Sequence, residues 1–142
     1  MKKLSVIICT FNRSELLRHC LDSLSKQEAD VNEYEIIVVD NHSTDDTQSV
    51  IRQFTQPHFH SFIEKNQGLS FARNRGAEEA NSPWLLYLDD DVLVESDLIS
   101  RALEWCERDD VASFGETFGP WYHYGKPHRF RDEYGSMNLH YS

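Results

Sequence analysis

The feature that most constrains the fold is a regular alternation of short apolar runs with longer segments that have one apolar face. Four runs rich in β-branched and other apolar residues cover 4–9, 34–39, 59–63 and 84–88. Continuous apolar runs of this length are typical of strands buried on both faces of a parallel sheet. The sequence therefore predicts buried strands over 4–9 and 34–39, and further strands over 59–63, 84–88 and 111–114.

The segments between these strands carry apolar residues three and four positions apart, as amphipathic helices do. Each segment also has a recognisable start signal. A cap side chain, a capping-box pair, or a glycine before the first apolar residue marks where a helix begins. The predicted starts are Ser14 as an N-cap, Ser43 with Asp46 as a capping box, Gly68, and Ser96 as an N-cap. Pro83 is predicted to end the third helix.

A strand followed by a helix, repeated four times, requires crossover connections. Such units build a mainly parallel sheet with helices on both faces, and the crossovers are right-handed. The 142 residues are enough for one compact α/β domain. We expect this domain to span 1–118, because the pattern ends there. Residues 119–142 have many aromatics and no period, and are predicted to be an irregular tail.

Charge and cysteine content exclude several classes of protein. The net charge of −10 argues against broad binding to nucleic-acid phosphates. Three cysteines without a Cys-x-x-Cys pair indicate reduced thiols, which favours a cytoplasmic location. The apolar run after Lys2 and Lys3 is too short for a signal sequence, and no segment approaches transmembrane length.

Polar motifs follow three of the predicted strands directly. They are Thr10-Phe-Asn-Arg13, Asp40-Asn41 and Asp89-Asp-Asp91. Ligands of open parallel sheets bind beyond the carboxyl ends of the strands, where the strand order reverses. If the strand order is 3-2-1-4, strands one and four meet at that point and strand two lies beside them. Thr10, Asp40 and the aspartates would then line one crevice.

The aspartate triplet can be an acidic turn or a metal site. Neighbouring carboxylates repel one another unless a cation lies among them, and oxygen ligands suit Mg²⁺ or Mn²⁺. Along an extended strand Asp89 and Asp91 point to one side and Asp90 to the other. We therefore expect Asp89 and Asp91 to hold the metal, with a diphosphate completing its shell.

Other side chains of the crevice have the chemistry of a nucleotide site. Asp40 can accept hydrogen bonds from a base or ribose, Phe11 can pack on the base, and Arg73 can approach phosphate oxygens. Structural roles are the alternatives: Arg73 can pair with Glu64 or Glu78, and Asp40 can cap the following helix.

Four motifs in order carry a family resemblance. They are Ser5-Val-Ile-Ile-Cys-Thr-Phe-Asn-Arg13, Ile36-Ile-Val-Val-Asp-Asn-His-Ser-Thr-Asp45, Asn66-Gln-Gly-Leu-Ser-Phe-Ala-Arg-Asn-Arg-Gly76 and Leu86-Tyr-Leu-Asp-Asp-Asp91. Over about residues 4–114 the chain resembles a family 2 glycosyltransferase of the Rossmann-like GT-A fold. The resemblance implies a nucleotide-diphosphate sugar donor and a divalent metal, Mn²⁺ or Mg²⁺. It implies nucleotide-sugar contacts for Thr10, Phe11, Asn12, Asp40, Arg73, Asn74 and Asp90, and metal contacts for Asp89 and Asp91.

The implied reaction is metal-dependent transfer of the sugar to an acceptor hydroxyl with inversion at the anomeric carbon. Family members continue well beyond this length, and the continuation supplies the acceptor wall and the general base. Asp132 and Glu133 follow the acidic motif too closely to match that base. We therefore expect a chain truncated at its C-terminus, with the general base absent and with 119–142 as the start of the acceptor-side region.

The partners follow from the same resemblance. The acceptor is a glycan, a lipid or a protein, and a lipid acceptor would bring the chain to the membrane surface. The aromatic tail offers a sugar or base platform, or an apolar patch through which the chain self-associates. His123, His128 and His140 have no zinc-ligand spacing.

Alternative functions remain at the level of sequence. The chain can be a nucleotide-sugar-binding module without turnover, because the acceptor half is missing. A dinucleotide-dependent dehydrogenase is disfavoured, since no Gly-x-Gly-x-x-Gly follows the first strand. A phosphatase with an aspartate nucleophile is disfavoured because Thr10 and Phe11 occupy the place where that acid is expected.

Overall fold

Four parallel strands form one sheet in the computed structural model, which describes residues 1–115. The strands are β1 (Leu4–Thr10), β2 (Tyr34–Asp40), β3 (Phe59–Ile63) and β4 (Trp84–Asp89). Their order is β3-β2-β1-β4 and every pair is parallel. The predicted strands and the order 3-2-1-4 are therefore confirmed.

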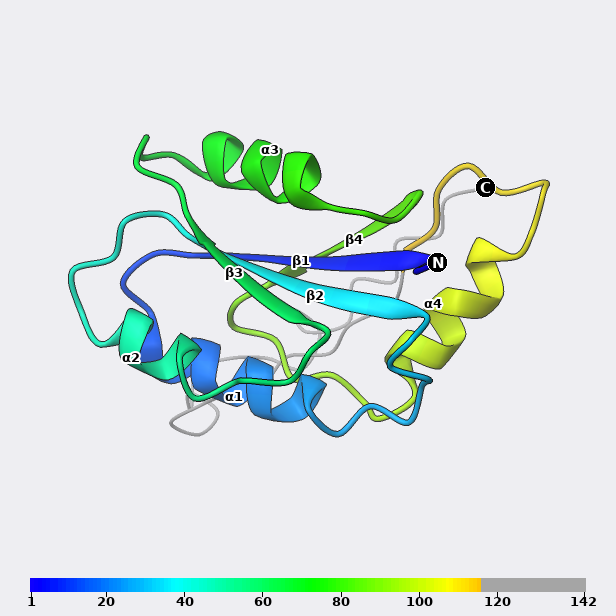
Figure 1. Cartoon of the computed structure of the whole chain (residues 1–142), viewed down its shortest axis with the longest axis horizontal. Helices are drawn as coiled ribbons and strands as arrows, with labels where there is room; N and C mark the ends of the chain where they lie inside the picture. Colours follow the sequence, from blue (N-terminus) through cyan, green and yellow to red (C-terminus); the bar gives the residue numbers. More distant parts are fainter. Residues whose placement is uncertain (116–142) are drawn as a thin grey trace, which may run out of the picture. The chain divides into compact units, whose positions relative to one another are not determined.

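The helices connect the strands in the order expected of crossover units. They are α1 (Ser14–Leu24), α2 (Thr47–Ile51), α3 (Leu69–Glu79) and α4 (Leu98–Cys106). Helix α3 lies on one face of the sheet, and α1 and α2 lie on the other (Figure 1). This arrangement confirms the α/β class with helices on both faces.

The apolar core lies against the two central strands, β1 and β2. Every residue of β2 is buried, and only Cys9 of β1 is partly exposed. Ile7, Ile37 and Val39 pack with Ala72 of α3. On α1, the buried residues are Leu17, Cys20, Leu21 and Leu24. The continuous apolar runs are thus explained by burial on both faces of the sheet.

Helix α3 approaches the sheet closely because it carries glycine at position 76. A Cβ atom placed there would overlap Cγ2 of Ile7. The start of α3 also needs glycine, since Gly68 has φ of 140°, a conformation that other residues rarely adopt. These two glycines determine where α3 begins and how near it lies to β1.

The helix starts differ from the predicted caps. Ser14 is the first residue of α1 and not its cap, and its backbone N–H donates to Asp45 Oδ2 at 3.2 Å. Asp45 Oδ1 also accepts from the N–H of Thr47 at 3.0 Å, while Asp46 is the N-cap of α2 without a side-chain cap bond, so the predicted Ser43–Asp46 box is not formed. Ser96 donates to Glu28, and the residue before α4 is Asp97. The three predicted caps were therefore wrong, and at α1 the acceptor comes instead from the loop before α2.

The fifth strand predicted over 111–114 is not formed. Ala112 and Ser113 are exposed in the structure, so the segment buries too little apolar surface to hold a strand in a sheet. The predicted run was short, and its small residues leave Val111 and Phe114 as the only sizeable apolar side chains.

The chain divides into two units, Met1–Arg108 and Asp109–Ser142, and the fold above is that of the first. The predicted boundary at residue 118, the aromatic tail, Asp132, Glu133 and the three histidines of the tail lie outside the described residues. No helix within residues 1–115 combines the length and apolarity needed to cross a membrane.

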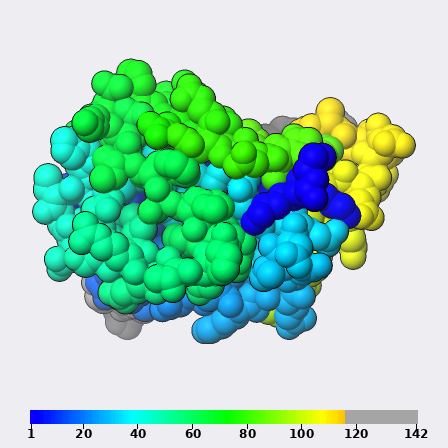
Figure 2. Space-filling model, in the orientation of Figure 1, coloured from blue at the N-terminus to red at the C-terminus, as the bar shows by residue number. Residues whose placement is uncertain are grey.

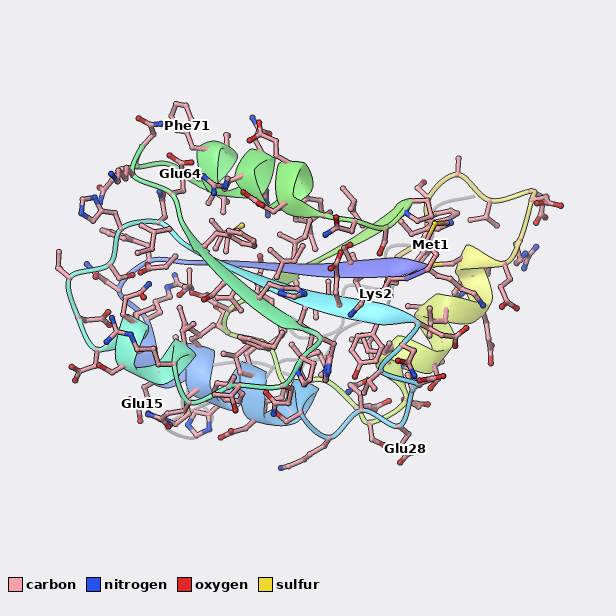
Figure 3. All side chains as sticks on the ribbon, in the orientation of Figure 1. Met1, Lys2, Glu15, Glu28, Glu64 and Phe71 are labelled. Carbon is pink, nitrogen blue, oxygen red and sulfur yellow. The ribbon has the colours of Figure 1, made fainter. Side chains whose placement is uncertain are left out.

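The two ends of the sheet differ in what they present. The chain starts at one end, where Met1 and Lys2 lie on the surface (Figures 2 and 3). Glu15, Glu64 and Phe71 lie toward the opposite end, where the strands finish (Figure 3). The polar motifs come directly at or after the ends of β1, β2 and β4, so they lie at this second end.

Candidate functional site

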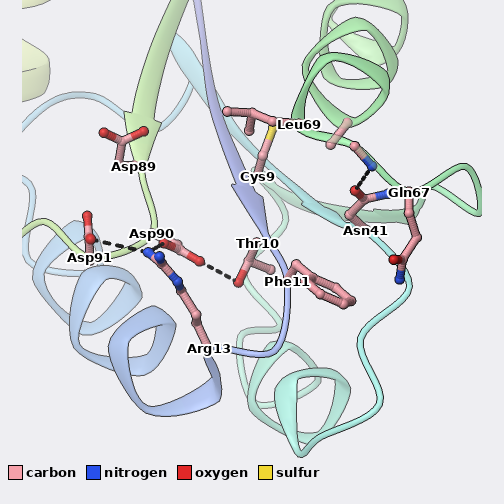
Figure 4. A pocket seen from close by; sticks show the side chains of 12 residues that line it. Cys9, Thr10, Phe11, Arg13, Asn41, Gln67, Leu69, Asp89, Asp90 and Asp91 are labelled. Atoms are coloured by element: carbon pink, nitrogen blue, oxygen red, sulfur yellow. Dashed lines mark hydrogen bonds and ion pairs between the residues drawn. The ribbon is translucent and has the colours of Figure 1, made fainter.

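A pocket of about 490 Å³ opens at the carboxyl ends of β1 and β4, beside the start of α3. Figure 4 shows its lining from close by. The lining residues are Cys9, Thr10, Phe11, Arg13, Asn41, Gln67, Gly68, Leu69, Ala72, Asp89, Asp90 and Asp91. Segments from four separate parts of the chain thus meet in one hollow, which includes Thr10 and the three aspartates but not Asp40.

The three aspartates point in different directions. Asp90 turns into the protein and is 5% exposed, and its Oδ2 accepts from Thr10 Oγ1 at 2.7 Å. Asp89 and Asp91 are exposed at the pocket (Figure 4). Strand alternation predicted that Asp90 faces away from the other two, but β4 ends at Asp89, and Asp90 and Asp91 both reach Arg13. Burial raises the pKa of Asp90, and the contacts with Thr10 and Arg13 oppose that rise.

A guanidinium lies between two of these carboxylates. Nη1 of Arg13 is 3.1 Å from Asp90 Oδ1 and 3.2 Å from Asp91 Oδ2. Sequence reasoning quoted Arg13 as part of a motif but assigned it no role. The available signal was its place, three residues after β1, which brings it to the same edge as the aspartates.

The loop after β1 is tied to the loop after β2. Asn12 has φ of 51°, a left-handed conformation in which asparagine is favoured among non-glycine residues. Its Oδ1 accepts from the Thr44 N–H at 2.7 Å, and its own N–H donates to Ser43 Oγ at 2.9 Å. Phe11, beside it, lines the pocket and is 43% exposed. Asn12 therefore positions Phe11 and does not line the pocket itself.

Asp40 and Asn41 have different surroundings. Asp40 is 1% exposed and lies outside the pocket lining, and it accepts hydrogen bonds from the Ser43 N–H and the Gln48 side chain. Asp40 thus holds the turn that leads to α2 and does not line the crevice as expected.

Asn41 was not among the predicted site residues, yet it lines the pocket. Its Nδ2 donates to the carbonyls of Glu64 and Asn66, and its Oδ1 accepts from the Gly68 N–H at 2.7 Å. These bonds fix the segment that leads into α3, including Gln67 and Gly68. The two residues after β2 thus act on two different loops.

Arg73 and Asn74 are on α3, outside the pocket lining. Nη2 of Arg73 is 3.8 Å from Asp89 Oδ1, and its guanidinium lies 6.0 Å from the centre of the Tyr87 ring. Asn74 is exposed. Arg73 therefore reaches the acidic motif from the α3 side, and its ion pair is with Asp89 instead of Glu64 or Glu78.

The exposed carboxylates of the acidic motif suit a divalent cation that needs few protein ligands. Within residues 1–115, no group of three or more His, Cys, Asp or Glu side chains is arranged to hold a metal. Asp89 and Asp91 are two exposed carboxylates on a pocket large enough for a ligand. Mg²⁺ and Mn²⁺ bind well to such sets, because water and substrate phosphates complete their shell.

Comparison with known proteins relates the chain to a family. A sequence model described as Glycosyl transferase family 2 matches residues 5–141. An uncharacterized glycosyltransferase, YfnE of Bacillus subtilis, is 36% identical over 110 residues, which are 76% of this chain and 28% of the relative. A GalNAc(5)-diNAcBac-PP-undecaprenol β-1,3-glucosyltransferase of Campylobacter jejuni is 36% identical over 123 residues, which are 84% of this chain and 38% of the relative. The chain therefore spans about a third of the length of these curated relatives.

Solved structures agree with the sequence relatives. The TarS structure of S. aureus with UDP-GlcNAc has a TM-score of 0.66 and 26% identity, over 72% of this chain and 30% of that one. The mannosyltransferase PcManGT of Pyrobaculum calidifontis, in complex with GDP-Man and Mn²⁺, has a TM-score of 0.70 and 27% identity. That match covers 77% of this chain and 33% of PcManGT.

Proposed function

The chain belongs to glycosyl transferase family 2, and from that premise we propose that its pocket binds a nucleotide-diphosphate sugar for transfer to an acceptor hydroxyl. One observation carries the proposal. Residues after β1, after β4 and at the start of α3 line a single pocket, and Thr10 is bonded to Asp90 across it. Such a crevice at the carboxyl ends of parallel strands is where nucleotides bind in folds of this class.

The side chains around the pocket have different proposed roles in donor binding. Phe11 offers an exposed aromatic face to the base, and Thr10 with Asp90 forms the rigid floor of the pocket. Asn12 and Asp40 hold the loops that carry Phe11 and Asn41. Arg73, with Asn74 beside it on α3, brings a positive charge toward the acidic edge where phosphates would lie.

Asp89 and Asp91 are the proposed ligands of Mn²⁺ or Mg²⁺. When bound, the cation supplies charge stabilisation to the departing diphosphate. Both carboxylates are exposed at the pocket, and both are near an arginine. Support for a metal comes from PcManGT, whose structure contains Mn²⁺ with GDP-Man. The bound donors of TarS and PcManGT make uridine and guanosine diphosphate sugars the first candidates here.

The acceptor side lies beyond the described residues. We propose that 1–118 forms the donor domain and that 119–142 begins the acceptor-side region, which in a longer chain would also provide the general base for an inverting transfer. The acceptor is a glycan, lipid or protein. A relative named for an undecaprenol-linked substrate favours a lipid-linked acceptor at the cytoplasmic membrane surface. We also propose that the chain self-associates through its aromatic residues in 119–142.

A thermal-shift screen tests donor binding. UDP, GDP, UDP-GlcNAc and GDP-Man are each added with and without Mn²⁺, and a ligand of the native state raises the melting temperature by mass action. We expect one base to stabilise the chain, and more so with Mn²⁺. The Asp22→Asn variant, on the exposed side of α1, should show the same shifts as wild type and serves as the control. If no nucleotide stabilises the chain under either condition, donor binding is refuted.

The alternative is a donor-binding module without turnover, which the same pocket would also serve. Product analysis separates the two functions. The stabilising donor is incubated with Mn²⁺, and free sugar and nucleoside diphosphate are measured over time. Slow hydrolysis or transfer supports an enzyme, whereas saturable binding without either product supports the module.

A further inference from the structure

Arg13 lies where a cation is expected, at the edge of the acidic motif. A single nitrogen, Nη1, is within 3.2 Å of carboxylate oxygens of both Asp90 and Asp91. Figure 4 shows the side chain reaching from the loop before α1 to both residues. The cluster of acids is therefore partly neutralised by the protein itself.

We propose that Arg13 is a positioning residue that competes with the divalent cation for Asp91. In this proposal Arg13 holds both aspartates when the site is empty. It keeps Asp90 and releases Asp91 when Asp91 turns to a cation and a diphosphate. The inference rests on the proposed donor function, and it concerns how this chain's own residues prepare the site.

The two contacts of Arg13 differ in how easily they break. The side chain of Asp90 is 6% exposed, and its second oxygen is already bonded to Thr10. Breaking that pair would leave a buried charge without its partner, which is costly. The side chain of Asp91 is 47% exposed, and that of Arg13 is 50% exposed. An exposed pair contributes little, so Asp91 is the carboxylate that can leave.

Asp89, like Asp91, is held less firmly than Asp90. Its oxygen is 3.8 Å from Arg73 and its side chain is 73% exposed, so it is held more loosely than Asp90. Asp89 and Asp91 are thus held more loosely than Asp90, and each is paired with an arginine. A guanidinium beside an arriving dication repels it, so the positive charge of Arg13 should weaken cation binding in the absence of a diphosphate.

Three variants of the 142-residue chain test this competition. Arg13→Gln removes the charge and retains a polar side chain. Arg13→Lys retains the charge, and one ammonium can replace the single nitrogen that contacts both acids. Arg18→Gln, on α1, removes an arginine whose partner is Gln53 and serves as the control. Binding of Mn²⁺ alone is measured by the loss of the electron-paramagnetic signal of the free ion.

We expect Arg13→Gln to bind Mn²⁺ more tightly than wild type, by up to about fivefold, since exposed ion pairs are worth no more than that. Arg13→Lys and Arg18→Gln should match wild type. Asp91→Asn should lose the Mn²⁺ site, which identifies the binding that is measured. A merely structural role for Arg13 would not tighten Mn²⁺ binding. Affinity equal to or below that of wild type in Arg13→Gln overturns the proposal.

A second measurement needs no metal. The unfolding free energies of wild type, Arg13→Gln, Asp91→Asn and the double variant form a cycle that isolates the pair. We expect the coupling between Arg13 and Asp91 to be no more than about 1 kcal/mol, as for other exposed pairs. A larger coupling also overturns the proposal, because Asp91 could not then leave Arg13. The two failures are distinct. If wild type binds nucleotide with Mn²⁺ but Arg13→Gln is unchanged, only the competition fails. If wild type binds neither nucleotide nor Mn²⁺ and the variant gains nothing, both fail.

Discussion

At the scale of single residues, Asp40 shows that the position of a carboxylate decides its role. It is the last residue of β2, and its two oxygens are engaged by the Ser43 N–H and Gln48. A buried acceptor that holds two donors stabilises a loop more than it serves a ligand. Its effect on nucleotide binding is therefore expected to be indirect.

We predict that Asp40→Ala lowers the unfolding free energy by about 1 to 3 kcal/mol, because it leaves buried donors unpaired. Nucleotide binding should weaken with and without metal, since the loop also holds Asn12. Urea unfolding and calorimetric titration measure the two effects. Unchanged stability would show that Asp40 does not hold the loop, and a loss seen only with Mn²⁺ would assign it to the metal instead.

Substitution of Asp91 should affect metal binding and leave stability nearly unchanged. Asp91→Ala removes an exposed carboxylate, so the unfolding free energy should change by no more than about 0.5 kcal/mol. The increase in nucleotide affinity that Mn²⁺ produces should be lost. Calorimetric titration with UDP or GDP, with and without Mn²⁺, measures this. Asp22→Ala is the control, and an Mn²⁺ response that survives in Asp91→Ala would remove this residue from the metal site.

At the scale of elements, α3 joins the core to the pocket. Its inner face carries Ala72 and Gly76 against β1 and β2, and its start provides Gly68 and Leu69 to the lining. The distance between α3 and the sheet therefore affects both stability and the shape of the site.

Gly76→Ala tests that distance. The added methyl group would overlap Ile7, which is buried and has little freedom to move. We predict a loss of about 1 to 3 kcal/mol in unfolding free energy from overpacking. The better helix propensity of alanine offsets about 1 kcal/mol of it. Nucleotide affinity should fall as well. Glu78→Ala, on the exposed side of the same helix, should change neither; a stable Gly76→Ala would show that α3 can move away freely.

A buried carboxylate fastens the other end of this helix. Glu35 of β2 is 2% exposed and accepts from Ser5 Oγ at 2.6 Å and from the Asn81 N–H at 2.8 Å. Burial by itself raises the pKa of Glu35. The hydrogen bonds from Ser5 and Asn81, with the nearby His60, outweigh it and hold the pKa below its ordinary value.

The pH dependence follows from the direction of that shift. The unfolded chain binds more protons than the folded one as the pH falls, so the stabilisation is present above about pH 4.3 and is lost below it. We predict that Glu35→Gln, which can keep the acceptor oxygen, reduces the slope of stability against pH below that value. Urea unfolding at pH 3 to 6 measures this, and an identical slope in wild type and variant would contradict it.

At the scale of the whole molecule, an acidic chain is expected to bind an acidic ligand. The net charge is −10, and the proposed donor is itself an anion. Arg13 and Arg73 bring positive charge to the pocket, and a divalent cation would reverse the sign of the field there. Donor binding should therefore depend more on metal than on the overall charge.

The proposed division of the chain has its own test. Every pocket-lining residue among those that the structure describes lies within Met1–Arg108. We predict that a chain ending at residue 118 binds the same nucleoside diphosphate with unchanged affinity. Its rate of donor hydrolysis should be lower than that of the 142-residue chain. Titration and product analysis on both chains measure this. Lost nucleotide binding would place part of the donor site in 119–142.

Much of this arrangement follows from local sequence. The β-branched runs require burial on both faces, and the glycine at 68 predicts a helix start, so strands, helices and strand order were all anticipated. The predictions of three cap residues and of a fifth strand over 111–114 were wrong. Caps depend on which acceptor a neighbouring loop supplies, as Asp45 does for α1, and that information is absent from the local pattern.

The sequence by itself determined that polar motifs reach one edge of a parallel sheet, because strand direction and the crossover rule leave little choice. Only the tertiary structure decided which way each side chain points there. Asp40 turned inward, Asn41 turned to α3, and Arg13 paired with acids 77 and 78 residues away. The physical reason is that apolar periodicity is a local property, whereas hydrogen bonds and ion pairs form between whichever loops the fold brings together.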